Sequence, residues 1–200
     1  MTGVRFAILR HATTTWNEQH RLQGQTDVAL NDKGEAEARH WRLPAPVDGW
    51  RRVSSPLQRA RRTAELLRPA AAVTLDPALR EMSFGSWEGA TIAQLRVEVG
   101  QPFIDAERRG LDFQPPGGES PRATMTRLAR WSARLAEQGE PVVAVSHKAA
   151  IRALLALATG WDMSGPPPHK LDWRRLHFFV AESDGRVAVD SLNVPLEHAP

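Results

Sequence analysis

The sequence predicts an α/β fold, a three-layer α/β/α sandwich with a mainly parallel central sheet and an antiparallel C-terminal addition. Three short apolar runs, at 4–9, 51–54 and 141–145, end in polar residues, and helical periodicity follows the second and third runs. Such runs are typical of strands covered on both faces, as in a parallel sheet between two layers of helices. Two strand-like segments around an Asp-Gly turn near the C-terminus predict the antiparallel addition.

The first predicted strand, 4–9, ends in Arg10 and His11. In open α/β sheets, ligands bind in the crevice outside the carboxyl ends of the strands, so these two residues are expected at a ligand site. An arginine recognises phosphate through a planar fork of donors, and a neighbouring imidazole can act as nucleophile or general base near neutral pH. The pair therefore points to phosphoryl chemistry, although a single dipeptide is a weak signal.

The second predicted strand, 51–54, leads into a helix with Ser55 as its cap and Pro56 as its first residue. Arg59 then falls in the first turns, near the positive end of the helix dipole. A cation is unfavourable there unless an anion lies nearby to offset it. Arg59 is therefore a candidate for anion binding.

The third junction has the clearest pattern. The apolar run 141–145 is followed by Ser146 and His147, and then by a helix that Gly160 terminates. A histidine beside an apolar strand is most often a core residue. His147, however, occupies the same strand-end position as His11 and faces a helix N-terminus, which favours a functional role.

The middle of the chain predicts a covering segment over the site. Residues 91–99 are expected to form a short helix, and 101–118 are rich in charge, Gly and Pro. We expect a substrate lid around 91–120. A longer helix should begin at Pro121, after a serine cap, and end before Gly139.

The C-terminal part predicts two strands, 176–180 and 186–192, joined by a hairpin turn at Asp184-Gly185. Composition agrees with a folded core, since 42% of the 200 residues are hydrophobic and no linker or internal repeat is visible. A single domain over 1–200 is therefore expected.

Charge and composition argue against several classes of partner. The pI of about 10.1 overstates the basicity, because the net charge is only +3 and a chain without Tyr or Cys has few groups that titrate above neutrality. The arginine pairs are scattered and are read as solvated faces rather than a nucleic-acid groove; they are Arg51-Arg52, Arg61-Arg62, Arg108-Arg109 and Arg174-Arg175. No nucleic-acid partner is expected.

Targeting and metal signals are also missing from the sequence. It has no apolar run of about 18 residues and no secretory pattern, so neither a membrane partner nor secretion is expected. The lack of cysteine suits a cytoplasmic location. No CxxC or HExxH pattern occurs, so we expect no metal and no cofactor. The sequence allows a homodimer but does not specify the oligomeric state.

Six segments together resemble the histidine phosphatases, also called the phosphoglycerate mutase-like superfamily. In the order that the family shows them, they are LRHATTTWN, RLQGQTDVALNDKGEAEA, SSPLQRARRTAELL, LREMSFGSWEG, PPGGES and VSHKAAIRALL. The resemblance covers most of the chain. The RLQG and PPGGES segments look most like those of α-ribazole phosphatases and broad-specificity phosphatases.

The resemblance implies roles for individual residues. His11 would be the phosphoryl-accepting nucleophile, Glu81 the general acid, and the phosphate pocket would consist of Arg10, Arg59, His147 and Asn17. Further contacts with substrate are expected from Thr14, Gln23, Gly24 and Lys148. The nearby alternatives for the acid are Glu88 and Glu98, and the spacing of Glu81 before Gly85 and Trp87 favours Glu81.

The chain departs from the family pattern at three positions. Ala12 replaces the usual Gly after the first histidine, Thr13 replaces a common Glu, and Lys148 replaces a frequent Gly after the second histidine. Ala12 would be strained only if its φ were positive. Lys148 could add positive charge at the rim of the site.

These features predict a metal-independent phosphatase for small phosphorylated substrates, with α-ribazole 5'-phosphate as one candidate. Phosphoryl transfer depends on positioning and charge stabilisation, for which two guanidiniums and an imidazole are suited. The short span between Glu81 and His147 favours a phosphatase over the alternative, a bisphosphoglycerate-dependent phosphoglycerate mutase. A second alternative is a non-catalytic module that binds phospho-ligands.

Overall fold

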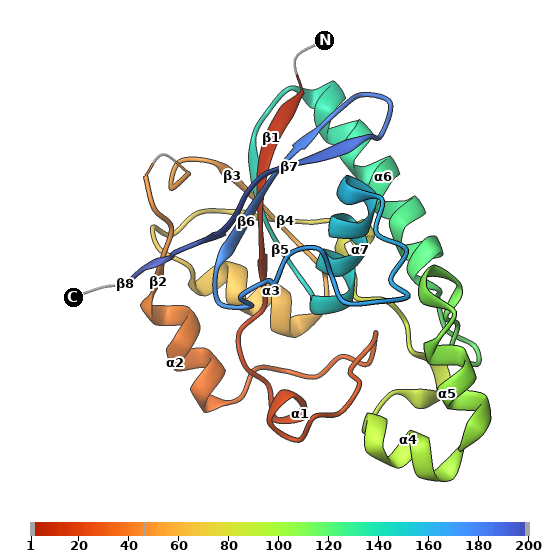
Figure 1. Cartoon of the computed structure of the whole chain (residues 1–200). Helices are drawn as coiled ribbons and strands as arrows, with labels where there is room; N and C mark the ends of the chain where they lie inside the picture. The colour runs from red at the N-terminus through yellow and green to blue at the C-terminus, as the bar shows by residue number, and fades with distance from the viewer. Residues whose placement is uncertain (1–2, 46, 199–200) are drawn as a thin grey trace.

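The computed structural model describes residues 3–45 and 47–198, and its central sheet confirms the predicted fold class (Figure 1). The order of the six strands is β4-β3-β5-β1-β6-β7. Strands β4, β3, β5 and β1 run parallel, whereas β6 and β7 are antiparallel additions. The strands of this sheet are β1 (Val4–Arg10), β3 (Arg51–Ser54), β4 (Val73–Leu75), β5 (Val142–Ser146), β6 (Leu176–Ala181) and β7 (Val187–Val194).

Helices cover both faces of the sheet, with α6 and α7 on one side and α2 and α3 on the other (Figure 1). The α-helices are α1 (Thr15–Glu18), α2 (Asp32–His40), α3 (Gln58–Leu66), α4 (Ile92–Glu98), α5 (Gln101–Glu107), α6 (Pro121–Gln138) and α7 (Lys148–Thr159). Three short 3-10 helices are η1 (Pro77–Leu79), η2 (Gly85–Trp87) and η3 (Gly110–Asp112). A separate two-stranded sheet pairs β2 (Trp41–Arg42) with β8 (Glu197–His198).

Strand β1 explains why the first apolar run shows no polar alternation. Phe6 and Ile8 point into the core under α6 and α7, where the edge of Trp131 meets the Phe6 ring at 5.2 Å. Ala7 and Leu9 point into the opposite core, under α2 and α3. Because each large apolar side chain contributes about 1.5–3 kcal/mol when it leaves water, both faces of the strand must be apolar.

Residues 92–112 form α4, α5 and η3, which lie beyond the carboxyl ends of the parallel strands (Figure 1). They have a small hydrophobic core of their own, in which Trp87 packs edge-on against Phe103 at 5.0 Å between ring centroids. Thr91 caps α4 and forms a reciprocal capping box with Gln94. The short helix expected within 91–99 is thus present as α4, and a second helix, α5, follows in the segment that was noted only for its charge, Gly and Pro.

The helix after β3 begins later than predicted. Its first residue is Gln58 rather than Pro56, and Leu57 stands at its N-cap without a side-chain hydrogen bond. The N–H of Ser55 donates to Val145 O at 3.0 Å, so the chain follows β5 for one more residue before it turns into the helix. The Ser55 hydroxyl accepts from the N–H of Leu57 at 3.3 Å and has a second partner, described below.

Arg52 was predicted to be solvated, and this prediction is wrong. Its side chain is completely buried, and its guanidinium donates to Leu67 O at 2.9 Å and Ala64 O at 3.4 Å. Carbonyls at the end of a helix have no partner within the helix, and Arg52 satisfies them from the neighbouring strand. Burial lowers the pKa of Arg52 from its usual value.

Candidate active site

The site lies where β1 and β5 end side by side. The N–H of His11 donates to Ser146 O at 3.0 Å, which extends the parallel pairing of the two strands by one residue. The next side chains, those of His11 and His147, are therefore brought together, with 5.2 Å between their ring centroids. Both side chains are buried.

The environment of His11 fixes its tautomer. Its Nδ1 lies 2.7 Å from the carbonyl oxygen of Ala12, and because a carbonyl can only accept, we assign the proton to Nδ1. The lone pair is then on Nε2. Burial, followed by the positive charges of Arg10 and Arg59, holds the pKa of His11 well below its usual value. His11 is therefore neutral and nucleophilic at pH 7.

His147 is held by the serine that was expected to cap a helix. The Ser55 hydroxyl lies 2.8 Å from His147 Nε2, while His147 Nδ1 is buried and has no hydrogen-bond partner in the described part of the chain. Burial, and then the positive charges of Arg59 and Arg10, lowers the pKa of His147 well below its usual value. This contact, 92 residues apart in sequence, has no local signal in the sequence.

Arg59 and Arg10 supply the positive charge of the site. The Arg59 side chain is fully buried and donates to Thr26 O at 2.9 Å and Gly24 O at 2.6 Å. Burial lowers the pKa of both arginines, yet a guanidinium stays protonated at neutral pH. Neither forms an ion pair with a carboxylate within residues 3–45 and 47–198, and the Nε of each is buried without a partner. Two such cations in one cavity favour an anionic ligand.

Glu81 faces the same cavity from the loop before η2. Its carboxylate accepts from the N–H groups of Ala149 at 3.1 Å and Ala150 at 2.9 Å, which are unpaired donors in the first turn of α7. The N–H of Met82 donates to it as well, at 2.9 Å. The carboxyl is thus fixed beside His147, the residue that precedes α7.

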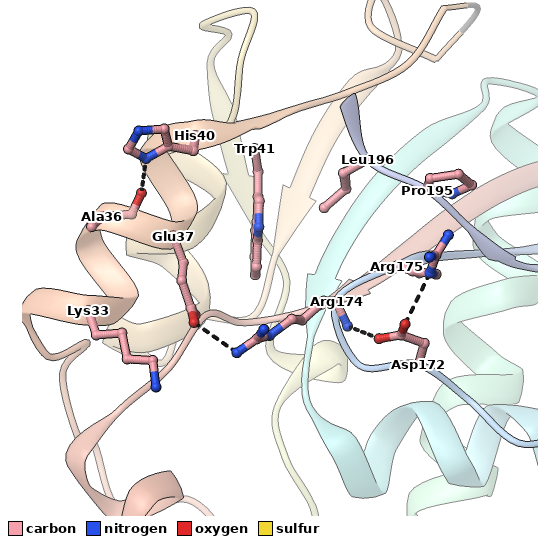
Figure 2. A pocket seen from close by; sticks show the side chains of 10 residues that line it. All are labelled: Lys33, Ala36, Glu37, His40, Trp41, Asp172, Arg174, Arg175, Pro195 and Leu196. Atoms are coloured by element: carbon pink, nitrogen blue, oxygen red, sulfur yellow. Dashed lines mark hydrogen bonds and ion pairs between the residues drawn. The ribbon is translucent and has the colours of Figure 1, made fainter. Parts of the chain in front are cut away.

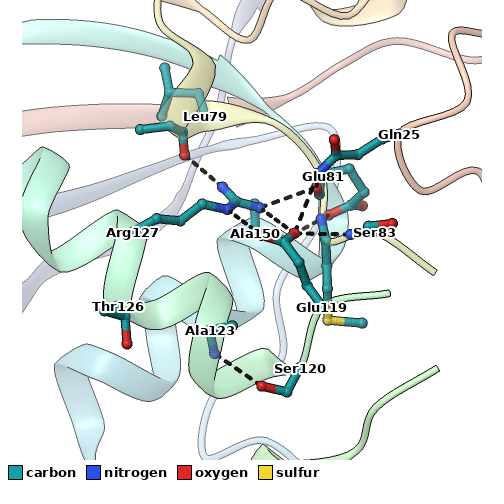
Figure 3. A network of polar contacts seen from close by, with 12 residues as sticks. Gln25, Leu79, Glu81, Ser83, Glu119, Ser120, Ala123, Thr126, Arg127 and Ala150 are labelled. Carbon is teal, nitrogen blue, oxygen red and sulfur yellow. Dashed lines mark hydrogen bonds and ion pairs between the residues drawn. The ribbon is translucent and has the colours of Figure 1, made fainter. Parts of the chain in front are cut away.

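A polar network on α6 holds the backbone of Glu81 from behind (Figure 3). Arg127 donates to Glu81 O at 3.1 Å and pairs with Glu119 at 3.1 Å. Glu119 accepts from Ser83 N at 3.0 Å, and Gln25 donates to Glu81 O at 3.2 Å. Arg127 is therefore half-buried, with only 20% of its side chain exposed.

The alternative acids are excluded from the cavity by their contacts. Glu88 accepts from the N–H groups of Gln25 at 2.9 Å, Thr26 at 2.8 Å and Phe84 at 3.0 Å, and so ties two loops together. Burial acts to raise the pKa of Glu88, but these hydrogen bonds outweigh burial and lower it. Glu98 is exposed at the end of α4.

The predicted substrate contacts in the loop after His11 fall into two groups, residues that line the cavity and residues that lie behind it. Asn17 and Gln23 line the cavity. Thr14 and Gly24 do not line it and act behind it. The Thr14 hydroxyl caps α1 and bonds Gln23 at 3.1 Å, and Gly24, with a φ of +51°, presents its carbonyl to Arg59. Their effect on a ligand would therefore be indirect.

The residues that depart from the family pattern are accommodated. Ala12 is buried, does not have a positive φ, and donates its N–H to Thr63 Oγ1 at 3.0 Å. The Thr13 hydroxyl donates to Glu37 at 2.7 Å. Lys148 is the first residue of α7 and lines the cavity.

The cavity itself has a volume of about 600 Å³ and lies between the strand ends and the 92–112 segment. The predicted residues that line it are Arg10, His11, Asn17, Gln23, Arg59, Glu81 and Lys148. His147 is buried behind it. Aromatic and apolar side chains from the far wall complete the lining, among them Phe84, Phe103 and Phe113. A ligand held by its phosphate at the arginines would have room for an organic group on this side.

A second hollow of about 610 Å³ lies nearby, between α2 and the segment before β6 (Figure 2). Its cations are occupied: Arg174 pairs with Glu37 at 3.2 Å, and Arg175 with Asp172 at 3.0 Å. In Figure 2 Arg174 reaches across to Glu37 on α2, whereas Arg175 and Asp172 pair on one segment. The paired charges leave this hollow without the anion preference of the main cavity.

Within residues 3–45 and 47–198, no cluster of three or more His, Cys, Asp or Glu side chains is arranged to hold a metal ion. In the same residues, no helix combines the length and the apolar character that a membrane span requires.

The buried histidines predict a loss of stability at mildly acidic pH. Burial lowers the pKa of His177 to about 4 and holds the pKa values of His11 and His147 well below their usual value, so all three stay neutral in the folded chain. Unfolded histidines bind protons near pH 6.5. Stability from these groups is therefore complete above pH 6.5 and falls as the pH drops below it. Each should cost about 1.4 kcal/mol at pH 5.5. Urea unfolding at pH 7.5 and 5.5 measures the difference in the free energy of unfolding between the two pH values. His177→Leu should reduce that difference by about a third. The same free energy of unfolding at both pH values would contradict the prediction.

Known proteins are similar to this chain over most of its length. The model of the histidine phosphatase superfamily (branch 1) matches residues 6–194. A 2,3-bisphosphoglycerate-dependent phosphoglycerate mutase 2 of Gloeobacter violaceus is 33% identical over 162 residues, which are 74% of this chain and 72% of the relative. The chain spans only 44% of the length of mycobacterial relatives that match it at 37% identity.

Two solved structures are similar along nearly the whole chain. A mycobacterial glucosyl-3-phosphoglycerate phosphatase, in a complex with VO3, has a TM-score of 0.75 and 28% identity, covering 96% of this chain and 99% of its own. A protein of Escherichia coli str. K-12 substr. MG1655 described as a putative alpha-ribazole-5'-P phosphatase has a TM-score of 0.82 at 24% identity, covering 99% and 100%, and shows the shared fold. With the family match over residues 6–194, the chain belongs to the histidine phosphatase superfamily.

Proposed function

We propose that this chain is a metal-independent phosphatase that hydrolyses small phosphomonoesters through a phosphohistidine on His11. One observation carries the proposal: a neutral, buried His11 with a free Nε2 shares its cavity with two guanidiniums, which have no carboxylate partner among the residues that the structure describes. Family membership and the phosphatase among the similar structures support a phosphatase.

In the first step, His11 Nε2 attacks phosphorus while the bond from phosphorus to the ester oxygen breaks. Arg10 and Arg59 bind the equatorial oxygens, whose charge must be stabilised as the phosphoryl group passes between the two partners. Glu81 donates its proton to the departing oxygen, so that an alcohol leaves rather than an alkoxide. His147, held by Ser55 behind the cavity, would support the phosphate pocket from behind, through its packing against His11.

In the second step, water replaces the alcohol. The Glu81 carboxylate takes a proton from the water, whose oxygen bonds to phosphorus as the bond from phosphorus to Nε2 breaks. His11 returns to its neutral form with the proton still on Nδ1, and inorganic phosphate leaves. Asn17 and Gln23 would contact the substrate directly, as would Lys148, while Thr14 and Gly24 would shape the site from behind.

The organic part of the substrate would occupy the side of the cavity lined by Phe84, Phe103 and Phe113. The 91–120 segment would act as a lid there, because Phe103 and Gly110 of α5 and η3 form part of the wall. An aromatic lining suits a ring-bearing alcohol, and α-ribazole 5'-phosphate is one candidate of this kind. A free phosphorylated substrate is then the partner that the site requires.

A phosphoglycerate mutase is the second candidate, and the 33% identity to the Gloeobacter violaceus mutase favours it. A mutase needs the same phosphohistidine, but must protect it from water until the phosphoryl group returns to the product. Transfer of phosphate between the hydroxyls of glycerate, faster than its release to water, would overturn our preference for hydrolysis.

The first assay is hydrolysis of p-nitrophenyl phosphate with and without EDTA. We expect turnover that is indifferent to the chelator, because the proposed steps use only side chains. Vanadate should inhibit competitively, since its trigonal bipyramidal form resembles the phosphoryl group in transfer. The measurement is the initial rate of nitrophenolate release, with a metal-dependent phosphatase as the control that EDTA inactivates.

Each outcome separates the candidates. Loss of activity on chelation, restored by a divalent metal, would contradict the metal-independent route. Phosphate-ester binding without hydrolysis of any ester would favour the non-catalytic binding module.

A further inference from the structure

Glu81, the proposed proton donor, lies on a segment without regular secondary structure. Residues 80–84 connect η1 to η2, and none of them belongs to a helix or a strand. Loops position side chains less precisely than helices and strands do. A proton donor nevertheless has to stay within hydrogen-bond distance of the oxygen that it protonates. Other contacts must therefore fix this loop.

An ion pair between Arg127 of α6 and Glu119 binds the loop on both sides of Glu81 (Figure 3). Arg127 donates to Ala78 O at 2.6 Å and to Glu81 O at 3.1 Å. Glu119 accepts from Ser83 N at 3.0 Å, and its own N–H donates to Ser83 O at 2.9 Å. The Arg127 guanidinium also bonds both oxygens of the Glu119 carboxylate, at 3.1 and 3.2 Å. One pair of side chains therefore holds the backbone before, at and after Glu81.

Burial distinguishes this ion pair from the others. Within residues 3–45 and 47–198, every other cation of an ion pair has at least 39% of its side chain exposed, against 20% for Arg127. Contact with both oxygens of the carboxylate also fixes the plane of the guanidinium. Neither Arg127 nor Glu119 lines the main cavity, so the pair acts on the loop and not on a ligand.

The side chain of Glu81 depends on the position of this loop. Its carboxylate accepts from Ala149 N at 3.1 Å and from Ala150 N at 2.9 Å. These N–H groups belong to the first turn of α7, where backbone donors have no partner within the helix. Arg127 and α7 thus hold Glu81 from opposite ends, by its carbonyl and by its carboxylate. A displacement of a reacting group by about 1 Å can lower a rate by about a hundredfold.

We propose that Arg127, together with Glu119, is a positioning residue for the proton donor: it holds the backbone of Glu81 so that the carboxyl group reaches both α7 and the departing ester oxygen. This inference rests on the proposed function, in which Glu81 is the proton donor. Since the pair lies outside the main cavity, its removal should slow the step that needs a proton and leave the binding of phosphate unchanged.

The test compares an ester whose leaving group needs a proton, 2-hydroxyethyl phosphate, with one whose leaving group does not, p-nitrophenyl phosphate. Arg127→Lys keeps the charge, but a single ammonium cannot bind both carbonyls and the carboxylate as the planar guanidinium does. We expect kcat/KM to fall by about tenfold or more for the alkyl ester and by less than about twofold for the nitrophenyl ester. Equal losses on the two esters would overturn the proposal, because Arg127 would then act on the phosphate pocket or on the fold as a whole.

Two further variants and a control complete the kinetic test. Glu119→Gln keeps an acceptor for Ser83 N but removes the charge of the pair, and should show the same selectivity to a smaller extent. In the Glu81→Gln background, Arg127→Lys should cause no further loss on the alkyl ester, because the proton donor is already absent. A further loss there would contradict the positioning role. Arg130→Lys, exposed on α6 and outside the main cavity, is the matched control that should leave both kcat/KM values unchanged.

Hydrogen exchange separates this inference from the proposed function. The Glu81 carboxylate protects the N–H groups of Ala149 and Ala150 whether or not an ester is hydrolysed. In Arg127→Met, NMR should show exchange of these two amides at least about tenfold faster than in wild type, as expected when a hydrogen bond to a charged group is weakened. Arg130→Met should show no change. Faster exchange in a chain that hydrolyses no ester would refute the phosphatase proposal and leave the role of Arg127 in positioning Glu81. Hydrolysis with unchanged exchange would refute that role alone.

Discussion

His11→Ala is expected to lower kcat/KM for p-nitrophenyl phosphate by about 10⁴-fold or more, because it removes the atom that accepts the phosphoryl group. The guanidiniums of Arg10 and Arg59 remain, so phosphate esters should still bind. The fold should persist, since His11 lies at the end of β1 and its backbone N–H still donates to Ser146 O. Initial rates, with inhibition by inorganic phosphate as the measure of binding, test this expectation.

The control is His40→Ala, because His40 is exposed on α2 and lies outside the main cavity. Its activity should equal that of the wild type. Trapping provides the direct readout: acid-labile, alkali-stable phosphate should label the wild-type chain and not His11→Ala. If His11→Ala keeps about a tenth of the activity or more, the route through His11 is wrong, since loss of a nucleophile costs orders of magnitude.

The parts of the site that the sequence predicted all depend on local patterns. His11 and His147 each follow an apolar strand, and parallel neighbouring strands bring such residues to one edge of a sheet. Arg59 was indicated by its place in the first turns of a helix. The two-sided burial of β1 was visible in its unbroken apolar run. Here a residue's position within its own element decides where it lies.

The contacts that the sequence did not predict join residues across long sequence separations. Arg127 acts on the backbone of Glu81, 46 residues away, and Ser55 acts on His147, 92 residues away. A helix shows in its sequence which face is apolar, but not which polar residue meets a distant carbonyl. Arg52 was misread for the same reason, because its partners are carbonyls and carry no sequence signal.

The same distinction applies to the charges of the cavity. That Lys148 is a cation at the start of a helix can be read from the sequence, whereas its lack of a carboxylate partner cannot. Partnership depends on where Glu81 and Glu107 direct their oxygens, and in the structure both are occupied, by backbone N–H groups and by Arg96 respectively. The preference for an anion is therefore a property of the fold rather than of the motif.

Glu81→Gln is expected to slow hydrolysis in proportion to how poor the leaving group is. Gln has nearly the same shape and can still accept from Ala150 N, but it has no proton to give to the departing oxygen. For 2-hydroxyethyl phosphate, whose alkoxide is a poor leaving group, kcat/KM, which does not include the second step with water, should fall by about 10²–10⁴-fold. For p-nitrophenyl phosphate the loss should be much smaller, since nitrophenolate leaves without a proton.

The measurement is the ratio of the two kcat/KM values in wild type and variant. Glu98→Gln, exposed at the end of α4, is the matched control that should leave both kcat/KM values unchanged. Equal losses on the two esters would mean that Glu81 only positions α7 and is not the acid. A selective loss on the alkyl ester cannot come from disturbed packing, because both esters need the same His11 and the same arginines. The comparison of the two leaving groups thus distinguishes two roles of the Glu81 carboxyl group, proton donation to the ester oxygen and hydrogen bonding to α7. The geometry alone does not distinguish them.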